Sequence, residues 1–338
     1  MVAVLVTATT SALLGRRGQV VWDNHACAPL RPGETDFLPT LERYRAAGFT
    51  MVSLNVGFAH NPAEQQLAML ATFRDWLAAR PDQYALISTA DDVRQAARDG
   101  RLGVAFDIEG MALLEGQLEL MAKLYELGVR WMSITYNRNN AIGGGCQDED
   151  GGLTAFGREV IAEAKRVGMV VCCSHTGHRT CRDVMEASEN PIIFSHSNAS
   201  AVYQHARNIP DELIVACART GGLVGVNGIG SFLGANDNRV ETYVRHLDHM
   251  VQLVGPAHVA IALDYVFDAT ELDDYIRAHP ALFPASEGYA TGLKMVPPEA
   301  LPEICNGLVR LGYTDGDLEL ILGGSLLRVA DAVWRAPA

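Results

Sequence analysis

Short β-rich runs alternate with amphipathic stretches along this chain, and this alternation limits the possible folds more than any other feature. Nine runs have the length and apolar content of strands: Val20–Asp23, Met51–Gly57, Ala85–Ala90, Gly103–Glu109, Trp131–Asn137, Met169–His175, Ile192–Ser197, Gly222–Asn227 and Val259–Asp264. The intervening stretches have helical periodicity, as in Phe37–Ala47, Glu64–Ala79, Leu118–Leu127 and Arg239–Leu253. Strands that alternate with helices form parallel sheets, and near-continuous apolar strands are buried on both faces.

Two architectures have this alternation, a closed (β/α)₈ TIM barrel and an open doubly wound sheet, and periodicity alone leaves both open. Nine strands are one too many for the barrel. We expect Ala85–Ala90 to lie outside it, because no polar residue suited to chemistry ends that run. No linker or shift in composition divides the 338 residues, so we predict a single α/β barrel domain over residues 1–338. The acidic, glycine-rich loop Gly143–Gly152 is interpreted as a lid.

Charge and cysteine content exclude several classes of protein. The formal net charge of −13 argues against a nucleic-acid partner, which would require clustered Lys and Arg. The seven cysteines are odd in number and have no framework spacing, which indicates reduced thiols and a cytoplasmic location. The N-terminal stretch MVAVLVTATTSALLGRRG is apolar, but no basic residue precedes its apolar part, and it is too short for a membrane span. We therefore expect neither a secretory signal nor a membrane partner.

Polar residues stand at or just after the ends of several predicted strands. In a (β/α)₈ barrel the carboxyl ends of the strands meet at one face, where the active site lies. The residues concerned are His25, Glu109, Tyr136, His175, His196 and Asp264. A buried Glu or His needs a partner, and two His with carboxylates are typical of a zinc site with a position open to water. Taken singly, each residue is also explained as an ordinary hydrogen-bonded polar group, and that alternative stays open.

A serine nucleophile is a weaker alternative. Ser195 precedes His196, but it lacks the GxSxG turn that exposes such a serine.

Several segments of the chain, in order, resemble those of the membrane (renal) dipeptidase family, zinc peptidases among the amidohydrolase-like barrels. WDNHAC is similar to the family's D-G-H-x-D opening, DIEG to its I-E-G, and GVRWMSITYNRNN to its GVRxLTLTHxxxN segment. SHTG followed by FSHSNA resembles its two-histidine block, and RNIPDE its R-N-(V/I)-x-D/E. HVAIALDYVFD and ILGGSLLRV resemble its HVGIGSDFDG and IGGNxLRV blocks. The resemblance runs from about Val21 to Val329 and implies a metallo-dependent hydrolase of the TIM-barrel type.

The resemblance also implies a metal site of one or two Zn²⁺ ions. His25 would bind one ion, Glu109 would bridge two, and His175 with His196 would hold the second. Where the family has the second Asp of its opening motif, this chain has Cys27. A thiolate suits zinc, although it is a softer ligand than a carboxylate. The alternative is that Cys27 is an ordinary small buried residue and the first metal site is weak or empty.

Catalytic and substrate-binding roles follow from the same resemblance. A metal-bound hydroxide would attack the amide carbonyl, and Asp264 would take its proton and pass it to the leaving amine. Arg207 would bind the terminal carboxylate of the substrate through its bidentate guanidinium. Tyr136 stands where the family has a histidine that contacts the substrate and its oxyanion, and a phenol could donate the same hydrogen bond.

The resulting hypothesis is a metal-dependent dipeptidase that acts on a small dipeptide with a free C-terminal carboxylate. Two alternatives stay open, because Cys27 and Tyr136 depart from the family. One is an amidohydrolase that acts on another small amide or an acyl amino acid. The other is a catalytically silent barrel, against which the retained charged residues argue. Family members are often dimers, so a homodimer is possible.

Overall fold

The computed structural model describes residues 13–58 and 61–336. Residues 1–12, which make up most of the apolar N-terminal stretch discussed above, lie outside this range. Among the helices of the described residues, none has both the length and the apolar content needed to cross a bilayer.

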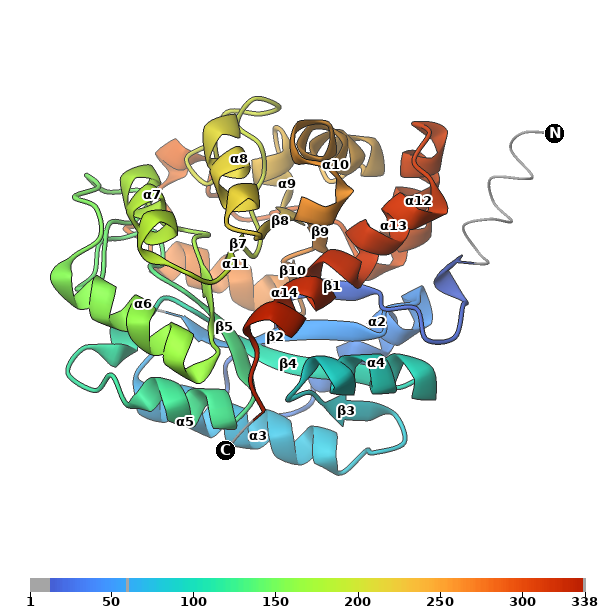
Figure 1. The fold of residues 1–338 in the computed structure, drawn as a ribbon, viewed down its shortest axis with the longest axis horizontal. Helices are drawn as coiled ribbons and strands as arrows, with labels where there is room; N and C mark the ends of the chain where they lie inside the picture. Colours follow the sequence, from blue (N-terminus) through green and yellow to red (C-terminus); the bar gives the residue numbers. More distant parts are fainter. Residues whose placement is uncertain (1–12, 59–60, 337–338) are drawn as a thin grey trace.

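A closed parallel barrel forms the centre of the molecule (Figure 1). Its strands are β1 (Trp22–Cys27), β2 (Met51–Phe58), β4 (Leu102–Glu109), β5 (Val129–Ser133), β6 (Val170–Cys172), β7 (Ile192–Phe194), β8 (Leu223–Asn227), β9 (Val259–Ala262) and β10 (Tyr265–Val266). From β1 to β9, each of these strands pairs in parallel with the next one. β10 pairs in parallel with β1, at the other end of this order. Only Leu263 and Asp264 separate β9 from β10, so together they fill one strand position. The sheet thus closes with eight strand positions, and the predicted (β/α)₈ barrel is confirmed.

The ninth predicted strand lies outside the barrel, as expected. β3 (Tyr84–Leu86) pairs only with β4, and the chain then enters α4 at Ala90. The capping box of α4 explains this boundary, because the Thr89 hydroxyl accepts from the Asp92 N–H while the Asp92 carboxylate accepts from the Thr89 N–H.

Helices follow most barrel strands and lie around the sheet (Figure 1). They are α2 (Leu41–Ala47), α3 (Ala63–Ala78), α4 (Ala90–Asp99), α5 (Leu120–Glu126), α6 (Ala155–Val167), α7 (His178–Ala187), α8 (Asp211–Arg219), α9 (Gly230–Leu233), α10 (Val240–Val254), α11 (Ala269–Ala278), α12 (Leu301–Arg310), α13 (Asp315–Glu319) and α14 (Ser325–Val333). The four amphipathic stretches used above as examples coincide, within about two residues at each end, with α2 and its preceding 3₁₀ turn, α3, α5 and α10.

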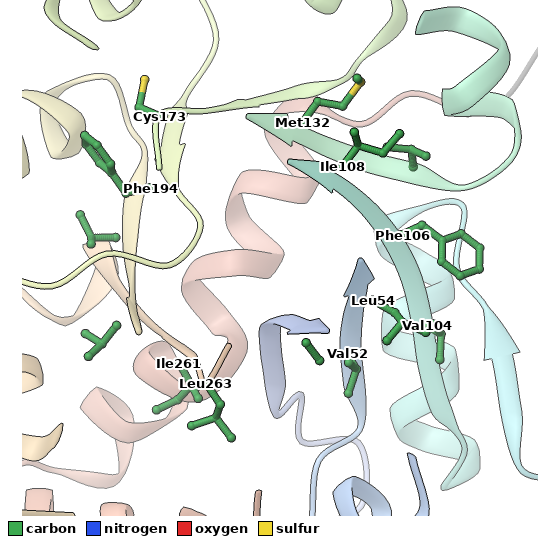
Figure 2. Close-up of a cluster of buried hydrophobic side chains, with 14 of the residues drawn as sticks. Val52, Leu54, Val104, Phe106, Ile108, Met132, Cys173, Phe194, Ile261 and Leu263 are labelled. Carbon is green, nitrogen blue, oxygen red and sulfur yellow. The ribbon is translucent and has the colours of Figure 1, made fainter. Parts of the chain in front are cut away.

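The two faces of each strand have different roles. The outward residues are apolar and pack against the surrounding helices; Figure 2 shows Val52, Leu54, Val104, Phe106 and Ile108 from β2 and β4 among them. The inward residues at the amino ends of the strands form a second apolar cluster with α4 and α14. That cluster includes Trp22, Met51, Ala105, Trp131, Cys172, Leu223 and Ala260 from the strands and Leu326 and Val329 from α14. This end of the barrel is therefore filled.

Inward residues become polar toward the carboxyl ends of the same strands. In β4 the inward series is Ala105, Asp107 and Glu109, and the eighth strand position runs from Ala260 to Asp264. Side chains two apart on a strand share a face, so the apolar series ends in a set of carboxylates inside the barrel. The site is built on these ends.

The loop Gly143–Gly152 does not have the position expected of a lid. The Asp150 carboxylate accepts hydrogen bonds from the backbone N–H groups of Arg179 and Thr180, in the first turn of α7, at 2.7 and 2.9 Å. Gly144 N–H also donates to the Thr180 hydroxyl. Among the described residues, the cavity at the carboxyl face is instead bordered largely by residues after β1, β2, β8 and β10. The glycine-rich composition indicated flexibility, but the Asp150 carboxylate fixes the loop to a helix.

Candidate active site

Strand β1 contains two of the predicted metal ligands, His25 and Cys27. It extends from Trp22 to Cys27 rather than ending at Asp23 as predicted, and its register with β2 shifts between Asp23 and Ala26. An irregularity of this kind re-aims side chains, and it places His25 fully inside the barrel. The His25 ring stacks on the His196 ring with 4.2 Å between centroids.

Glu109, His175 and His196 meet at one point above the barrel interior. Glu109 Oε1 lies 2.9 Å from His175 Nε2 and 3.1 Å from His196 Nε2. The two Nε2 atoms lie 2.9 Å apart. All three side chains are buried. Two imidazole nitrogens and one carboxylate oxygen therefore face a common centre, as ligands of a metal ion do.

The hydrogen bonds of the histidines indicate which atoms carry protons. His175 Nδ1 lies 2.7 Å from the Oδ1 of Asn137, an acceptor, so Nδ1 holds the proton and Nε2 a lone pair. The same Nε2 accepts a hydrogen bond from Arg207 Nη2 at 2.9 Å. Burial lowers the pKa of His175 well below its ordinary value, and the Arg207 charge acts in the same direction. Burial likewise lowers the pKa of His196. Both imidazoles are therefore neutral.

A second ligand group adjoins the first. Cys27 Sγ lies 3.3 Å from His25 Nε2 and 3.4 Å from Asp264 Oδ1, and His25 Nε2 lies 3.5 Å from that same oxygen. His25 Nε2 is also 3.6 Å from Glu109 Oε1, so Glu109 stands between the two groups. The sets His25–Glu109–His196 and His25–Cys27–Asp264 each bring three ligand atoms within 4.8 Å of one another. Cys27 thus lies where it could ligate a metal ion with His25 and Asp264, although burial raises the pKa of its thiol.

Asp264, the predicted acid–base residue, is positioned by a hydrogen bond to one of its two carboxylate oxygens. Asp264 Oδ2 accepts a hydrogen bond from Asn227 Nδ2 at 2.7 Å, which leaves Oδ1 toward His25 and Cys27. Burial raises the pKa of Asp264 above its ordinary value. A carboxylate whose pKa is moved toward neutrality is suited to general base chemistry.

Tyr136 and Arg207 flank the histidines. The Tyr136 ring stacks on the His175 ring at 4.4 Å, and it belongs to the loop after β5, because that strand ends at Ser133 rather than continuing to Asn137 as predicted. The Arg207 guanidinium, 3% exposed, lies between His175 Nε2 and the Phe232 ring, whose centroid is 5.4 Å away. The structure therefore brings all eight predicted site residues to one end of the barrel.

A cavity of about 260 Å³ opens over these residues. Its floor includes Cys27, Glu109, Tyr136, His175 and Asp264, and its walls are largely aromatic and aliphatic. A concave, mainly apolar cavity with a few converging polar groups is typical of a small-molecule site.

Backbone strain is concentrated in this region. Four described non-glycine residues have positive φ, and Asn137, His175 and Asp264 are three of them, with φ of 61°, 66° and 53°. Such conformations cost on the order of 1–3 kcal/mol each and persist where the surroundings enforce them, often at functional sites.

The sequence matches the family model described as membrane dipeptidase (peptidase family M19) over residues 30–280. The chain belongs to this family. The resemblance noted in the motifs is thereby confirmed.

Two curated relatives are dipeptidases of the same kind. Dipeptidase verJ of Clonostachys rogersoniana is 28% identical over 94% of this chain and 74% of that protein. An uncharacterized dipeptidase of Schizosaccharomyces pombe is 31% identical over 72% of this chain, and the match covers 56% of that protein's length.

Solved structures of similar fold agree with the family. An amidohydrolase from Pseudomonas aeruginosa superposes with a TM-score of 0.84 at 25% identity, covering 97% of this chain and 99% of that one. A metallo peptidase from Rhodobacter sphaeroides, liganded with a phosphinate mimic of L-Ala-D-Ala, has a TM-score of 0.74 at 21% identity, covering 93% and 99%.

The sequence did not predict the residues that form hydrogen bonds with the predicted site residues. Asp107 lies 3.2 Å from His25 Nδ1 and accepts from Asn55 Nδ2 at 2.9 Å. Its position two residues before Glu109 on β4 puts it on the same inward face, and that spacing could have revealed it. No comparable signal marks Asn137 or Asn227, whose roles depend on how separate loops meet.

Proposed function

We propose that this member of the membrane dipeptidase family hydrolyses the amide bond of a dipeptide with a free C-terminal carboxylate, and that it uses one or two Zn²⁺ ions. The convergence of His175 Nε2, His196 Nε2 and Glu109 Oε1 carries the proposal. The relatives named as dipeptidases agree with it.

The residues present fit a divalent metal. Two neutral imidazoles aim Nε2 at each other and at a carboxylate, so a cation between them would satisfy all three groups. His175, His196 and Glu109 would hold one ion, and His25 and Cys27, with Glu109 shared, would hold the other. When bound, a divalent cation there polarises a carbonyl and lowers the pKa of water. Nitrogen and sulfur donors favour zinc over magnesium or calcium.

The side chains supply the remaining steps. Asp264, half-buried and hydrogen-bonded to Asn227, would accept the proton of the attacking water and deliver it to the leaving amine. Arg207 would bind the substrate carboxylate. The single lone pair of His175 Nε2 now accepts from Arg207, so a metal ligated there would free that guanidinium N–H for the substrate.

Tyr136 would act on the carbonyl group of the amide bond that is hydrolysed. Burial raises the pKa of its phenol well above the ordinary value, so the hydroxyl keeps its proton and could donate a hydrogen bond to the carbonyl oxygen.

A cytoplasmic location is also part of the proposal, because all seven cysteines carry free thiols. Homodimer formation remains a prediction, which the mass of the protein in solution would test.

Metal analysis combined with a dipeptide screen tests the proposal. The purified protein should contain zinc and should hydrolyse dipeptides but not their C-terminal amides. A metal-loaded, folded protein that cleaves no dipeptide would contradict it.

A further inference from the structure

An aromatic and aliphatic cluster lines the cavity, and it reaches from Phe232, whose ring lies against the Arg207 guanidinium, across to α11. It belongs to the segments after β8 and β10 and includes Ile276, Phe283 and Tyr289, with Leu272 and Tyr275 of α11 packed against it. These five side chains all line the cavity. If this cluster served only to order these segments, its apolar side chains would be covered by one another. Instead, they leave apolar surface that faces a cavity of about 260 Å³.

The barrel topology places one part of this cluster, where Tyr275 of α11 meets Phe58, opposite Arg207, the proposed carboxylate-binding residue. Arg207 follows β7, and β7 is four strand positions from β2 in a barrel of eight, so the loops after these strands lie across the mouth from each other. Phe58, at the end of β2, packs edge-on against Tyr275 of α11 with 5.4 Å between centroids. Leu30 lies beside them, and its carbonyl accepts from Gln65 in α3. The side remote from Arg207 therefore has Leu30, Phe58, Leu272 and Tyr275 as its walls.

Asp268, Glu271 and Asn61, polar residues that the structure describes on that side, are already engaged with their own chain. Asp268 caps α11 by accepting from the N–H groups of Thr270 and Glu271. The Glu271 carboxylate lies 3.4 Å from the Arg31 guanidinium. The Asn61 side chain accepts from the Phe58 N–H and donates to Gln65. A charged group of a ligand entering here would have to compete with these contacts, whereas an apolar group would not.

We propose that this side is a subsite for a large apolar side chain on the N-terminal residue of the dipeptide. The inference rests on the proposed function, because a dipeptide with its carboxylate at Arg207 and its amide over Glu109 directs its first residue across the mouth. A small first residue would leave the apolar walls in contact with water. One added methylene in such a pocket changes kcat/KM by about 10–200-fold.

The test compares kcat/KM of the metal-loaded enzyme for Gly-Ala, Ala-Ala, Leu-Ala, Phe-Ala and Lys-Ala. We expect Leu-Ala and Phe-Ala to exceed Ala-Ala at least tenfold, and Lys-Ala to fall below Leu-Ala. Equal rates for large and small first residues, or a preference for Lys-Ala, would overturn the subsite while leaving the dipeptidase function intact. Hydrolysis of none of the five would instead contradict the proposed function.

A pair of variants locates the effect. Leu272→Ala removes part of the apolar wall and should lower kcat/KM for Leu-Ala about tenfold, with little change for Gly-Ala. Leu311→Ala removes the same atoms from a surface position that is 55% exposed, and it should leave both substrates unchanged. If Leu272→Ala lowers both substrates equally, or neither, the wall is structural.

Discussion

Three parts of His175 each have a defined position in the site: the two ring nitrogens and the backbone. Its Nδ1 is fixed by Asn137, its Nε2 faces Glu109 and His196, and its backbone is held at φ 66°. A ring oriented in this way offers a lone pair at a defined position, so the ordering of His175 is achieved before any ligand binds.

Replacing His175 with alanine should abolish tightly bound metal and the stabilisation that the metal gives. Metal binding favours the native state by linkage, so added zinc should raise the Tm of the parent protein but not that of His175→Ala. Metal content and thermal unfolding measure this. His178→Ala is a matched control, because His178 begins α7 three residues later, and it should retain its metal. Undiminished zinc in His175→Ala would refute the ligand assignment.

Arg207 differs from a surface arginine because its guanidinium is buried between His175 and Phe232. Arg207→Lys keeps the charge but loses the planar fork. The change should cost about 1.5–3 kcal/mol in discrimination between a free and an amidated dipeptide, as expected for a charge-assisted hydrogen bond. Rates on both substrates give the value. Unchanged discrimination would make Arg207 a structural residue.

Cys27 and Tyr136 are the two positions at which the site departs from the family pattern. Under the proposed function, softer ligation at Cys27 and a neutral phenol at Tyr136 would both weaken polarisation of the carbonyl. The double change Cys27→Asp with Tyr136→His should therefore raise turnover of ordinary dipeptides. A folded, metal-loaded double variant with no gain on any dipeptide would favour a different small amide as the substrate.

At the scale of elements, the Asp150 carboxylate and the Gly144 N–H both join the loop Gly143–Gly152 to α7. Asp150 is the acceptor for backbone N–H groups in the first turn of α7, where a negative charge also meets the positive end of the helix dipole. Partial burial opposes the charge, but the hydrogen bonds of Thr180, Gly152 and Arg179 outweigh it and lower the pKa of Asp150.

Asp150→Ala should destabilise the protein by about 1 kcal/mol, the usual cost of a lost cap. Because the folded pKa is depressed, this contribution is complete above the unfolded pKa near 4 and is lost as pH falls through the folded pKa. The difference in unfolding free energy between parent and variant should therefore shrink in acid. Glu149→Ala, an exposed neighbour, is the control. A difference independent of pH would mean that the carboxylate charge is not what joins the loop to α7.

Helices and strands could be predicted where residues close together in the sequence determine them. Near-continuous apolar runs of strand length marked the barrel strands, and the polar residues that end them, such as Glu109 and Asp264, were visible as interruptions of these runs. The boundaries of β1 and β5 were wrong, because a register shift and a loop conformation extend one strand and shorten the other. The lid interpretation failed for a similar reason, since the contacts of Asp150 join segments about thirty residues apart.

The whole molecule explains why the site is at one end of the barrel only. Apolar inward residues and α14 fill the amino end, whereas Asp107, Glu109 and Asp264 point inward at the carboxyl end, and Glu109 and Asp264 line the cavity there. Burying these carboxylates is costly unless cations or hydrogen bonds compensate. His25 beside Asp107 and the Asn227 amide beside Asp264 supply part of that compensation, and a metal would supply the remainder. Arg207 and Cys27 could be assigned roles only through the family motifs, because no local pattern marks them.

Activity measured on one preparation before chelation, after removal of metal and after return of zinc tests the central claim most directly. The substrates are a dipeptide and its C-terminal amide, and bound metal is quantified at each stage. We predict that dipeptide hydrolysis disappears with the metal, returns with one or two equivalents of zinc, and stays low on the amide throughout. Hydrolysis that persists in the metal-free protein, or full zinc occupancy with no cleavage of any dipeptide, would contradict the claim.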